Sequence, residues 1–538
     1  MRLMRYLYLI LSLALLSYPG HAQEKKHIVS GDFYLNSQYY IEDERIDATL
    51  LPGGEKVGLN SALSINYSWG GLSAGLRYEA YLPPMLGFER DLEGHGIGNA
   101  FLSYNYKKFE VTVGSFYEQF GSGMALRSYY EPQLGLDNSI FGIRAKYSSD
   151  ALSFILLHGR NRRYFDRDAA RVTGGDVTVT LESLIKSLEE KELGIDLGLS
   201  IVYTDEENLT GLDIPSTTTF TALRTHVRYK NFNFGIEYGF KTREPHSLNR
   251  FSDAIGQGLF VSGAYSVKGF GVNIYWKYIE NMFFRSNRES FSNVTSNINY
   301  LPPNSNVNTY RLTTLYPYAV QGNGENGINV DVFFNLKKGT TLGGKYGTKV
   351  ATDVSYITSL KSDEPSMNGV FENPKFLAFS DSLYYANWNV EITKRINTKL
   401  NTTFGWSYIV YNQDVIEGIP NSGFIKSLTF FSDLTLRLPK RRFLRGELQH
   451  LSSKQHLKNW AFALLEYGWS SQFSSYISDE WNYSNNLHYY AIGLNYKKNA
   501  TSVGLSYGRE RSGLICVGGV CRFVPASNGL RVQISTSF

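Results

Sequence analysis

The chain has 538 residues, of which 15% are aromatic (39 Tyr, 33 Phe and 7 Trp), together with 50 Gly, 6 Met and 2 Cys. The formal net charge is +5, from 54 Lys and Arg against 49 Asp and Glu. A balance this close predicts no nucleic-acid partner. Two cysteines cannot form a disulfide framework or a four-cysteine zinc site, and so many aromatic residues argue against disorder. This composition indicates β-structure with many turns.

The first residues have the pattern of a secretory signal peptide. Two arginines precede an apolar core from Tyr6 to Leu16, and Gly20-His21-Ala22 offers small residues at a cleavage point. The apolar stretch is shorter than the ~18 residues that a membrane-spanning helix needs. We therefore expect a signal peptide over residues 1–22 and an exported domain over 23–538.

The rest of the chain alternates between apolar and polar residues. In residues 530–538 apolar side chains or Thr alternate with polar ones, and the stretch ends on Phe538. Similar alternating stretches cover 59–69 and 72–80. Period-two alternation places apolar side chains toward lipid and polar ones toward a lumen. Short, often basic turns such as Lys107-Lys108 separate pairs of these stretches. The longer polar connections are 41–56, 82–96, 118–137, 160–173, 205–216, 244–255, 285–324, 361–378, 413–422, 479–486 and 512–524.

This pattern predicts an all-β chain that forms a single large transmembrane antiparallel β-barrel of about 24 strands, each of roughly ten residues. Short turns would be periplasmic and long loops extracellular, as in outer-membrane barrels. An even strand number would place both termini in the periplasm. We expect the protein to lie in the cell outer membrane, in contact with outer-membrane lipids and lipopolysaccharide.

One connection has helical periodicity. Leu181, Leu184, Ile185 and Leu188 are spaced at i, i+3, i+4 and i+7 within 181–191, which predicts a short amphipathic helix on the periplasmic side. Such a helix either caps the barrel or docks a partner, because so small an apolar stripe is not stable alone.

Motifs for chemistry are weak. Gly71-Leu-Ser73-Ala-Gly75 matches the nucleophile-elbow pattern, but it begins an alternating stretch and no helix follows it. The histidines His158, His226, His246 and His450 are scattered without ligand spacing. We expect no enzyme activity, no metal and no cofactor.

Cys516 and Cys521 enclose Val-Gly-Gly-Val in the last long connection. An exported protein meets oxidising conditions, and the two glycines would let the chain fold back so that the cysteines meet. We expect a disulfide that clips this loop.

Inward-facing positions carry charges of both signs. One interpretation is an interior network of ion pairs and water, and the other is a basic lining that selects anions; the presence of both signs favours the network. The lumen-facing candidates are Arg77, Glu79, Arg144, Lys146, Arg224, His226, Arg228, Glu237, Asp433, Arg437, Arg445, Glu447 and Arg531.

Two stretches carry a family resemblance. Asn308–Gly327 runs directly into the strand Ile328–Leu336, and Arg171–Leu181 leads into the predicted helix. Together they resemble an uncharacterised outer-membrane β-barrel family of Bacteroidota, a domain of unknown function. The resemblance implies an association with type IX secretion and carries no known active site.

The predicted function is a structural component or partner of a cell-envelope complex. Strands begin by His27, whereas a TonB-dependent transporter should carry a long plug domain first. The alternative is a diffusion channel or ligand-specific porin, since a barrel of about two dozen strands is wide enough for an aqueous lumen unless loops fill it.

Overall fold

The computed structural model describes residues 26–208, 211–292, 294–363, 370–371 and 373–538. The predicted signal peptide, residues 1–22, lies outside the described residues.

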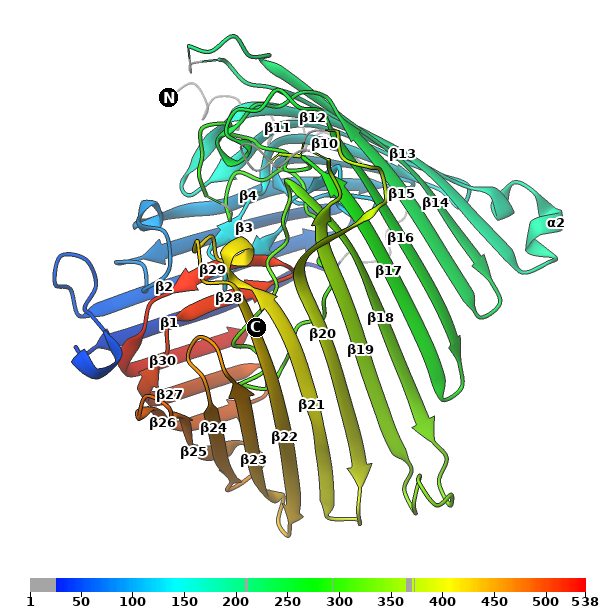
Figure 1. Ribbon diagram of the computed structural model, residues 1–538. Coiled ribbons are helices and arrows are strands. Elements are labelled where there is room, and N and C mark those ends of the chain that lie inside the picture. The colour runs from blue at the N-terminus through cyan, green and yellow to red at the C-terminus, as the bar shows by residue number, and fades with distance from the viewer. Residues whose placement is uncertain (1–25, 209–210, 293, 364–369, 372) are drawn as a thin grey trace.

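The chain forms a closed antiparallel β-barrel of 24 strands (Figure 1). Each strand pairs with its neighbours in the sequence, and the first strand closes the sheet against the last, with Tyr34 opposite Ser535. The predicted fold class and strand number are confirmed. The strands are β1 (Ile28–Tyr40), β2 (Val57–Trp69), β3 (Leu72–Tyr81), β4 (Gly94–Tyr106), β5 (Phe109–Phe116), β10 (Ile140–Ser148), β11 (Leu152–Arg163), β12 (Asp166–Thr180), β13 (Leu193–Asp205), β14 (Thr217–Tyr229), β15 (Phe232–Lys241), β16 (Gly256–Val267), β17 (Phe270–Glu280), β18 (Gly324–Leu336), β19 (Thr348–Leu360), β20 (Phe379–Arg395), β21 (Leu400–Asn412), β22 (Phe424–Leu438), β23 (Arg442–Ser453), β24 (Trp460–Gly468), β25 (Phe473–Asn482), β26 (Leu487–Lys498), β27 (Thr501–Glu510) and β30 (Ser527–Ser537).

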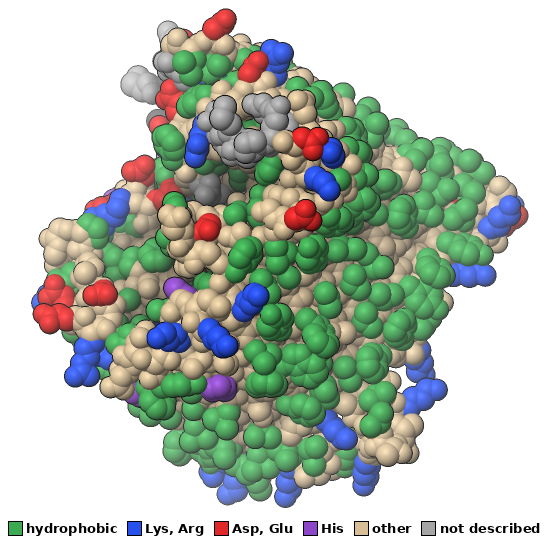
Figure 2. All heavy atoms as spheres, viewed as in Figure 1, with side chains coloured by type: hydrophobic (Ala, Val, Ile, Leu, Met, Phe, Trp, Pro, Cys, Tyr) green, Lys and Arg blue, Asp and Glu red, His purple; other side chains and the backbone are tan. Residues whose placement is uncertain are grey.

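Alternation along each strand separates an apolar outer wall from a polar inner wall. In β2, Leu63 and Ile65 are exposed on the outside, while Asn60 and Ala62 are buried inside. Figure 2 shows hydrophobic atoms covering the outer wall over the long strands β13–β22, with Lys and Arg gathered at the lower rim. The apolar belt therefore follows from period-two patterning, and the basic rim follows from the basic short turns.

The two ends of the barrel differ. One rim is formed mainly by short turns, in which Lys107, Lys230 and Lys440 adopt the left-handed conformation that tight hairpins require. The opposite rim carries the long loops. The start of β1 and the end of β30 lie at the short-turn rim, where the backbones of Gly31 and Phe538 exchange two hydrogen bonds of 2.9 Å.

Some predicted loop boundaries are wrong. Residues 160–173 are not a loop, because β11 and β12 continue to a turn at Tyr164-Phe165. The ladder persists there although most of the side chains are polar or small, so the hydrophobic signal fades before the strands end. Residues 454–459, between β23 and β24, form a connection that the pattern did not indicate.

The segment 181–191 is shorter and more broken than predicted. It contains a 3-10 turn, η3 (Leu181–Ser183), and one turn of α-helix, α2 (Lys186–Glu189), separated by Ile185 in an extended conformation. Leu184 and Ile185 are exposed, so the predicted apolar stripe does not form on one continuous helix. The reason is local: the Glu182 carboxylate accepts from the Ile195 backbone N–H at 2.8 Å, which ties the first turn to β13.

The remaining elements lie in the long connections. No helix among the described residues has the length and apolar character to span a membrane. The smaller elements are β6 (Gln119–Phe120), β7 (Leu126–Arg127), β8 (Tyr130–Glu131), β9 (Leu136–Asp137), β28 (Gly513–Val517), β29 (Val520–Val524), η1 (Glu44–Ile46), η2 (Arg90–Leu92), η4 (Ser247–Asn249) and α3 (Gln413–Ile416).

Candidate functional site

Three connections from the long-loop rim fold into the barrel, and their described residues, 117–139, 281–292 with 294–323, and 511–526, are here called the plug. In Figure 1 the green connection between β17 and β18 runs inside the ring of strands, and the red β28–β29 hairpin lies against it. A direct contact joins them, since the Val320 N–H donates to the Gly519 carbonyl at 3.1 Å. The lumen is therefore occupied by the chain itself.

The plug is held to one wall by an apolar cluster. A fully buried apolar side chain contributes about 1.5–3 kcal/mol, so this cluster alone resists displacement of the plug. It joins the wall residues Ile140, Ile155, Leu157, Val172, Val202, Phe220, Ala222 and Ile279 to the plug residues Phe120, Met124, Ala125, Leu126, Met282, Phe284, Ile298 and Leu301.

A second apolar cluster holds the plug to the opposite wall. Here the strands present aromatic side chains inward, among them Trp460, which is fully buried. The cluster joins the wall residues Ile357, Tyr384, Tyr385, Ile409, Tyr411, Ile425, Leu451, Trp460 and Phe462 and the α3 residue Ile416 to the plug residues Leu312, Leu315, Tyr316 and Tyr318.

A buried ion pair fixes the middle of the plug. Lys277 on β17 and Glu325 on β18 are 2.6 Å apart, and the lysine side chain is 2% exposed and the glutamate 0%. Lys277 also donates to the carbonyl of Pro302. Glu325 accepts from the Gln321 N–H at 2.7 Å and from the Tyr318 hydroxyl. Each charge thus contacts its partner and the plug.

A similar group holds the start of the 281–323 connection. Lys241 donates to Glu244 at 2.6 Å and to the carbonyl of Phe283. Glu244 accepts from the Arg285 N–H at 2.8 Å, and the Arg285 guanidinium donates to the Ser290 carbonyl at 2.9 Å. Burial raises the pKa of Glu244 and lowers the pKa of Arg285 to about 10. These charges are shielded from solvent by the plug.

Arginines anchor the plug to the last strands. Arg311 donates to Glu480 on β25 and to Glu510 on β27, each at 2.6 Å. Arg511 donates to the other carboxylate oxygen of Glu480 at 2.8 Å. Glu480 is almost fully buried, and each of its two carboxylate oxygens accepts a hydrogen bond from a plug arginine.

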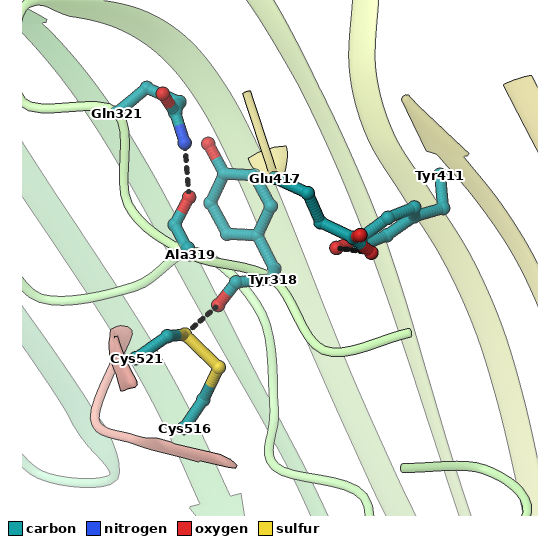
Figure 3. Close-up of a disulfide and its surroundings, with 7 residues drawn as sticks. All are labelled: Tyr318, Ala319, Gln321, Tyr411, Glu417, Cys516 and Cys521. Atoms are coloured by element: carbon teal, nitrogen blue, oxygen red, sulfur yellow. Dashed lines mark hydrogen bonds between the residues drawn. A yellow bond between two sulfur atoms is a disulfide. The ribbon is translucent and has the colours of Figure 1, made fainter. Parts of the chain in front are cut away.

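The expected disulfide between Cys516 and Cys521 is present and closes the β28–β29 hairpin (Figure 3). The Cys521 sulfur lies 3.9 Å from the Tyr318 carbonyl oxygen. Leu514 and Gly519 on this hairpin line two cavities. One, of about 370 Å³, is bounded by 303–318 and the other, of about 800 Å³, by residues that include Phe283 and Ile419. The hairpin divides the free space inside the barrel.

The structure brings Arg77 and Glu79 into one buried network. Arg77 donates to Glu79 at 2.6 Å, and Arg162 donates to Glu79 at 2.7 Å and to Asp137 at 2.6 Å. Arg77 also pairs with Asp137. Arg162 and Asp137 were not among the candidates. Arg162 lies in a segment that the sequence predicted as a loop, and Asp137 lies in a long connection, where no alternation indicates an inward position.

Other candidates also form pairs. Arg144 contacts Glu118 at 3.0 Å and Glu110, and Arg224 contacts Asp176 at 2.7 Å. Lys146 lies on β10 beside this group, opposite Glu110 and Ile155. Glu237 lies opposite Arg224 in register but accepts from the plug N–H of Ser122 at 2.8 Å.

The remaining candidates form two small groups, one around Arg228 and one around Arg445, while Arg531 and Arg437 lie outside both groups. Arg228 contacts Asp196 and reaches Glu182 at 2.5 Å, and the His226 ring lies 3.7 Å from Asp196. Arg445 contacts Asp433 at 2.8 Å and also Glu447. Arg531 donates to Gln38 at 2.7 Å. Arg437 is exposed, one residue before the end of β22.

The motif residues considered for catalysis are dispersed. Ser73 lies within β3, opposite Ser68 and Ser103. His158 and His450 lie on the outer wall, and His246 lies in the loop after β15. Across the described part of the chain, no group of three or more His, Cys, Asp or Glu side chains is arranged to hold a metal ion.

The buried ion pair predicts an asymmetric response to substitution. Lys277→Met leaves the Glu325 carboxylate buried without a cation, so we expect a loss of about 3–5 kcal/mol in the free energy of unfolding and faster proteolysis within 302–321. Adding Glu325→Gln removes the unpaired charge and should recover most of this loss. Equal stability of the single and double variants would contradict the proposed anchoring.

His246 predicts acid sensitivity of the same region. Burial and the nearby cations Lys241, Arg285 and Arg288 hold its pKa well below its usual 6.5. The unfolded chain then binds a proton that the folded chain does not, so stability is full above about pH 6.5 and falls below it. The denaturant midpoint should drop between about pH 7.5 and about pH 5.5, and His246→Gln should reduce that drop. The exposed His450→Gln serves as the control and should leave the drop unchanged.

Known proteins with similar structures are bacterial β-barrels. The P pilus usher (PapC) translocation pore is similar with a TM-score of 0.46 and 10% identity over 95% of this chain and 99% of that one. The siderophore receptor PirA from Pseudomonas aeruginosa has a TM-score of 0.42 and 11% identity over 96% and 81%. A BenF-like porin from Pseudomonas fluorescens Pf-5 has a TM-score of 0.37 and 9% identity over 96% and 100%.

No curated protein matches this sequence. A match to one family extends over residues 3–538, nearly the whole chain, and the description of that family assigns no function. This agrees with the resemblance to a domain of unknown function, while a link to Bacteroidota or to type IX secretion is not part of the match. The chain belongs to the family of unknown function DUF6029.

Proposed function

We propose that this protein is an integral outer-membrane β-barrel with a closed lumen that serves as a structural component or partner of a cell-envelope complex. The observation that carries the proposal is the plug, which two apolar clusters and several buried ion pairs hold against opposite walls. A barrel whose own chain occupies its lumen is poorly suited to free diffusion. Its function is then expected to depend on its rims and loops.

The membrane location is supported by the closed sheet and the apolar outer wall. Within a bilayer only helices and closed barrels satisfy every backbone hydrogen-bonding group. The short-turn rim, where β1 begins and β30 ends, is then periplasmic, and the long-loop rim faces the outside. The contacts with outer-membrane lipids and lipopolysaccharide follow from this placement.

The short-turn rim offers a surface for a periplasmic partner. Leu184 and Ile185 are 62% and 45% exposed at the tip of the η3–α2 connection, and Leu181 and Leu188 are partly exposed beside them. Because the connection projects from the rim (Figure 1), these side chains are free to contact another protein. The family resemblance favours a secretion complex, the type IX machinery, as the assembly involved.

A ligand-specific porin is the second candidate. The two cavities on either side of the disulfide hairpin favour it, since a cavity of about 800 Å³ is large enough for a small solute. Transport would then require the plug to move.

Conductance in planar bilayers separates a closed barrel from an open pore. The wild-type protein should be silent, because the plug blocks the lumen. Replacement of residues 303–318 by a short Gly-Ser linker should produce steady ohmic current, whereas shortening the exposed tip 52–55 should not. Steady current through the wild-type protein would contradict the closed lumen.

Isolation of the protein from native membranes tests the partner. With the tagged wild-type chain, envelope proteins should co-purify in fixed ratio, as identified by mass spectrometry. Leu184→Ser with Ile185→Ser should reduce their recovery at unchanged barrel yield. Leu342→Ser is the control, because Leu342 is 71% exposed on another connection of the same rim. Recovery of the wild-type barrel alone would favour the porin.

A further inference from the structure

The outer wall over β10–β13 carries arginines where a barrel usually carries apolar or aromatic side chains. Register places Phe141, Arg160, Arg171 and Asp205 in one row across these four strands. This row lies close to the long-loop rim, since β11 ends at Arg163. It is therefore a charged row at one edge of the apolar belt.

The rows below it become steadily more apolar. Two residues further from the rim, about 7 Å along a strand, the row is Ile143, His158, Thr173 and Tyr203. After a further two residues it is Ala145, Leu156, Gly175 and Ile201. This order of charged, then amphipathic, then apolar side chains matches the order of headgroup, interface and acyl chains in a leaflet.

The Arg160–Arg171 pair is only partly compensated within the chain, by one carboxylate. Two like charges directly opposite each other on neighbouring strands destabilise a sheet. Arg171 is 60% exposed and its guanidinium reaches Asp205 only at 3.9 Å. Arg160 is exposed on the same face, next to Phe141. An anion between the two guanidinium groups would remove this repulsion.

A groove of about 470 Å³ lies beside the pair on the outer wall. The backbones of Gly142 and Gly159, which lie opposite each other, form its floor, and Val113 and Ile143 are apolar side chains at its edge. Arg167 adds a third guanidinium, 4.5 Å from the centre of the Phe141 ring. The groove thus combines an apolar trough with basic groups at its rim-side end.

We propose that this groove binds a phosphorylated lipid of the outer leaflet. The proposal rests on the outer-membrane location given above. The phosphate lies between Arg160 and Arg171, whose planar guanidinium groups donate paired hydrogen bonds to phosphate oxygens. An acyl chain follows the trough past Ile143 toward Leu156. A bisphosphorylated glycolipid such as lipid A has both features.

Native mass spectrometry of the purified barrel in detergent tests this site. The probe is bisphosphorylated lipid A, compared with the same lipid after its phosphates are removed. Arg160→Gln with Arg171→Gln should weaken binding of the phosphorylated lipid about tenfold or more. Binding of the dephosphorylated lipid should be weak for every variant. Arg160→Lys with Arg171→Lys should retain part of the affinity, because the charge remains while the paired geometry is lost.

Lys426→Gln is the matched control. Lys426 is exposed near the long-loop end of β22, but Val410 rather than a cation lies opposite it. This variant should bind lipid A like the wild-type protein. Heat-modifiable gel migration shows that each variant is folded.

Two outcomes would overturn the site. The first is equal binding of lipid A by the wild-type and double-glutamine barrels, and the second is equal binding of phosphorylated and dephosphorylated lipid. Loss of a co-purifying protein with unchanged lipid binding would assign the groove to a protein instead. Fractionation of membranes by density is a separate measurement: absence of the wild-type chain from the outer membrane would refute the location itself, whatever the lipid result.

Discussion

A sheet of 24 strands that closes on itself encloses more space than its own inward side chains can fill. The closure gives each strand of the wall two paired neighbours, but it leaves a wide lumen whose lining carries charges. The long connections after β5, β17 and β27 enter this space and supply both apolar contacts and counter-charges. The arrangement of the interior is therefore a consequence of the strand number.

The buried ion pairs define the position of the plug more than its stability. A pair such as Lys277 and Glu325 gains little over well-packed apolar side chains, because both charges lose water on burial. Yet the hydrogen bonds of the pair depend on one position of the plug. Lys277 donates to the Pro302 carbonyl, and Glu325 accepts from the Gln321 N–H. Apolar clusters tolerate sliding, whereas these contacts specify a single register between plug and wall.

The wall was predictable from the sequence and the plug was not. Alternation with period two, broken by basic turns, is a local signal, so the fold class, the strand number and the inward position of residues such as Arg224 could be derived. Lys241 and Lys277 could have been found in the same way, since both lie on inward positions of strands. The disulfide followed from the spacing of Cys516 and Cys521 with glycines between them.

Other features depend on contacts that no local pattern records. The apolar residues Phe284, Ile298 and Leu312 are spread through a polar connection without a period, and such a connection has the same composition whether it lies outside the barrel or inside it. In β11 and β12 the strands continue beyond the apolar belt, so the hydrophobic pattern ended before the ladder did. At 181–191 the Glu182 side chain is used by β13, which breaks the helix that periodicity indicated.

The contact between Val320 and Gly519 links the order of synthesis to the order of assembly. Val320 belongs to the connection before β18, while Gly519 belongs to the last connection, immediately before the strand that seals the barrel. We expect the first part of the plug to lie within the curved, unsealed sheet before β30 pairs with β1. Docking of the hairpin and sealing of the seam then form one step. A chain that lacks β30 would leave its interior both open and incompletely packed, because the hairpin that contacts Val320 leads directly into that strand.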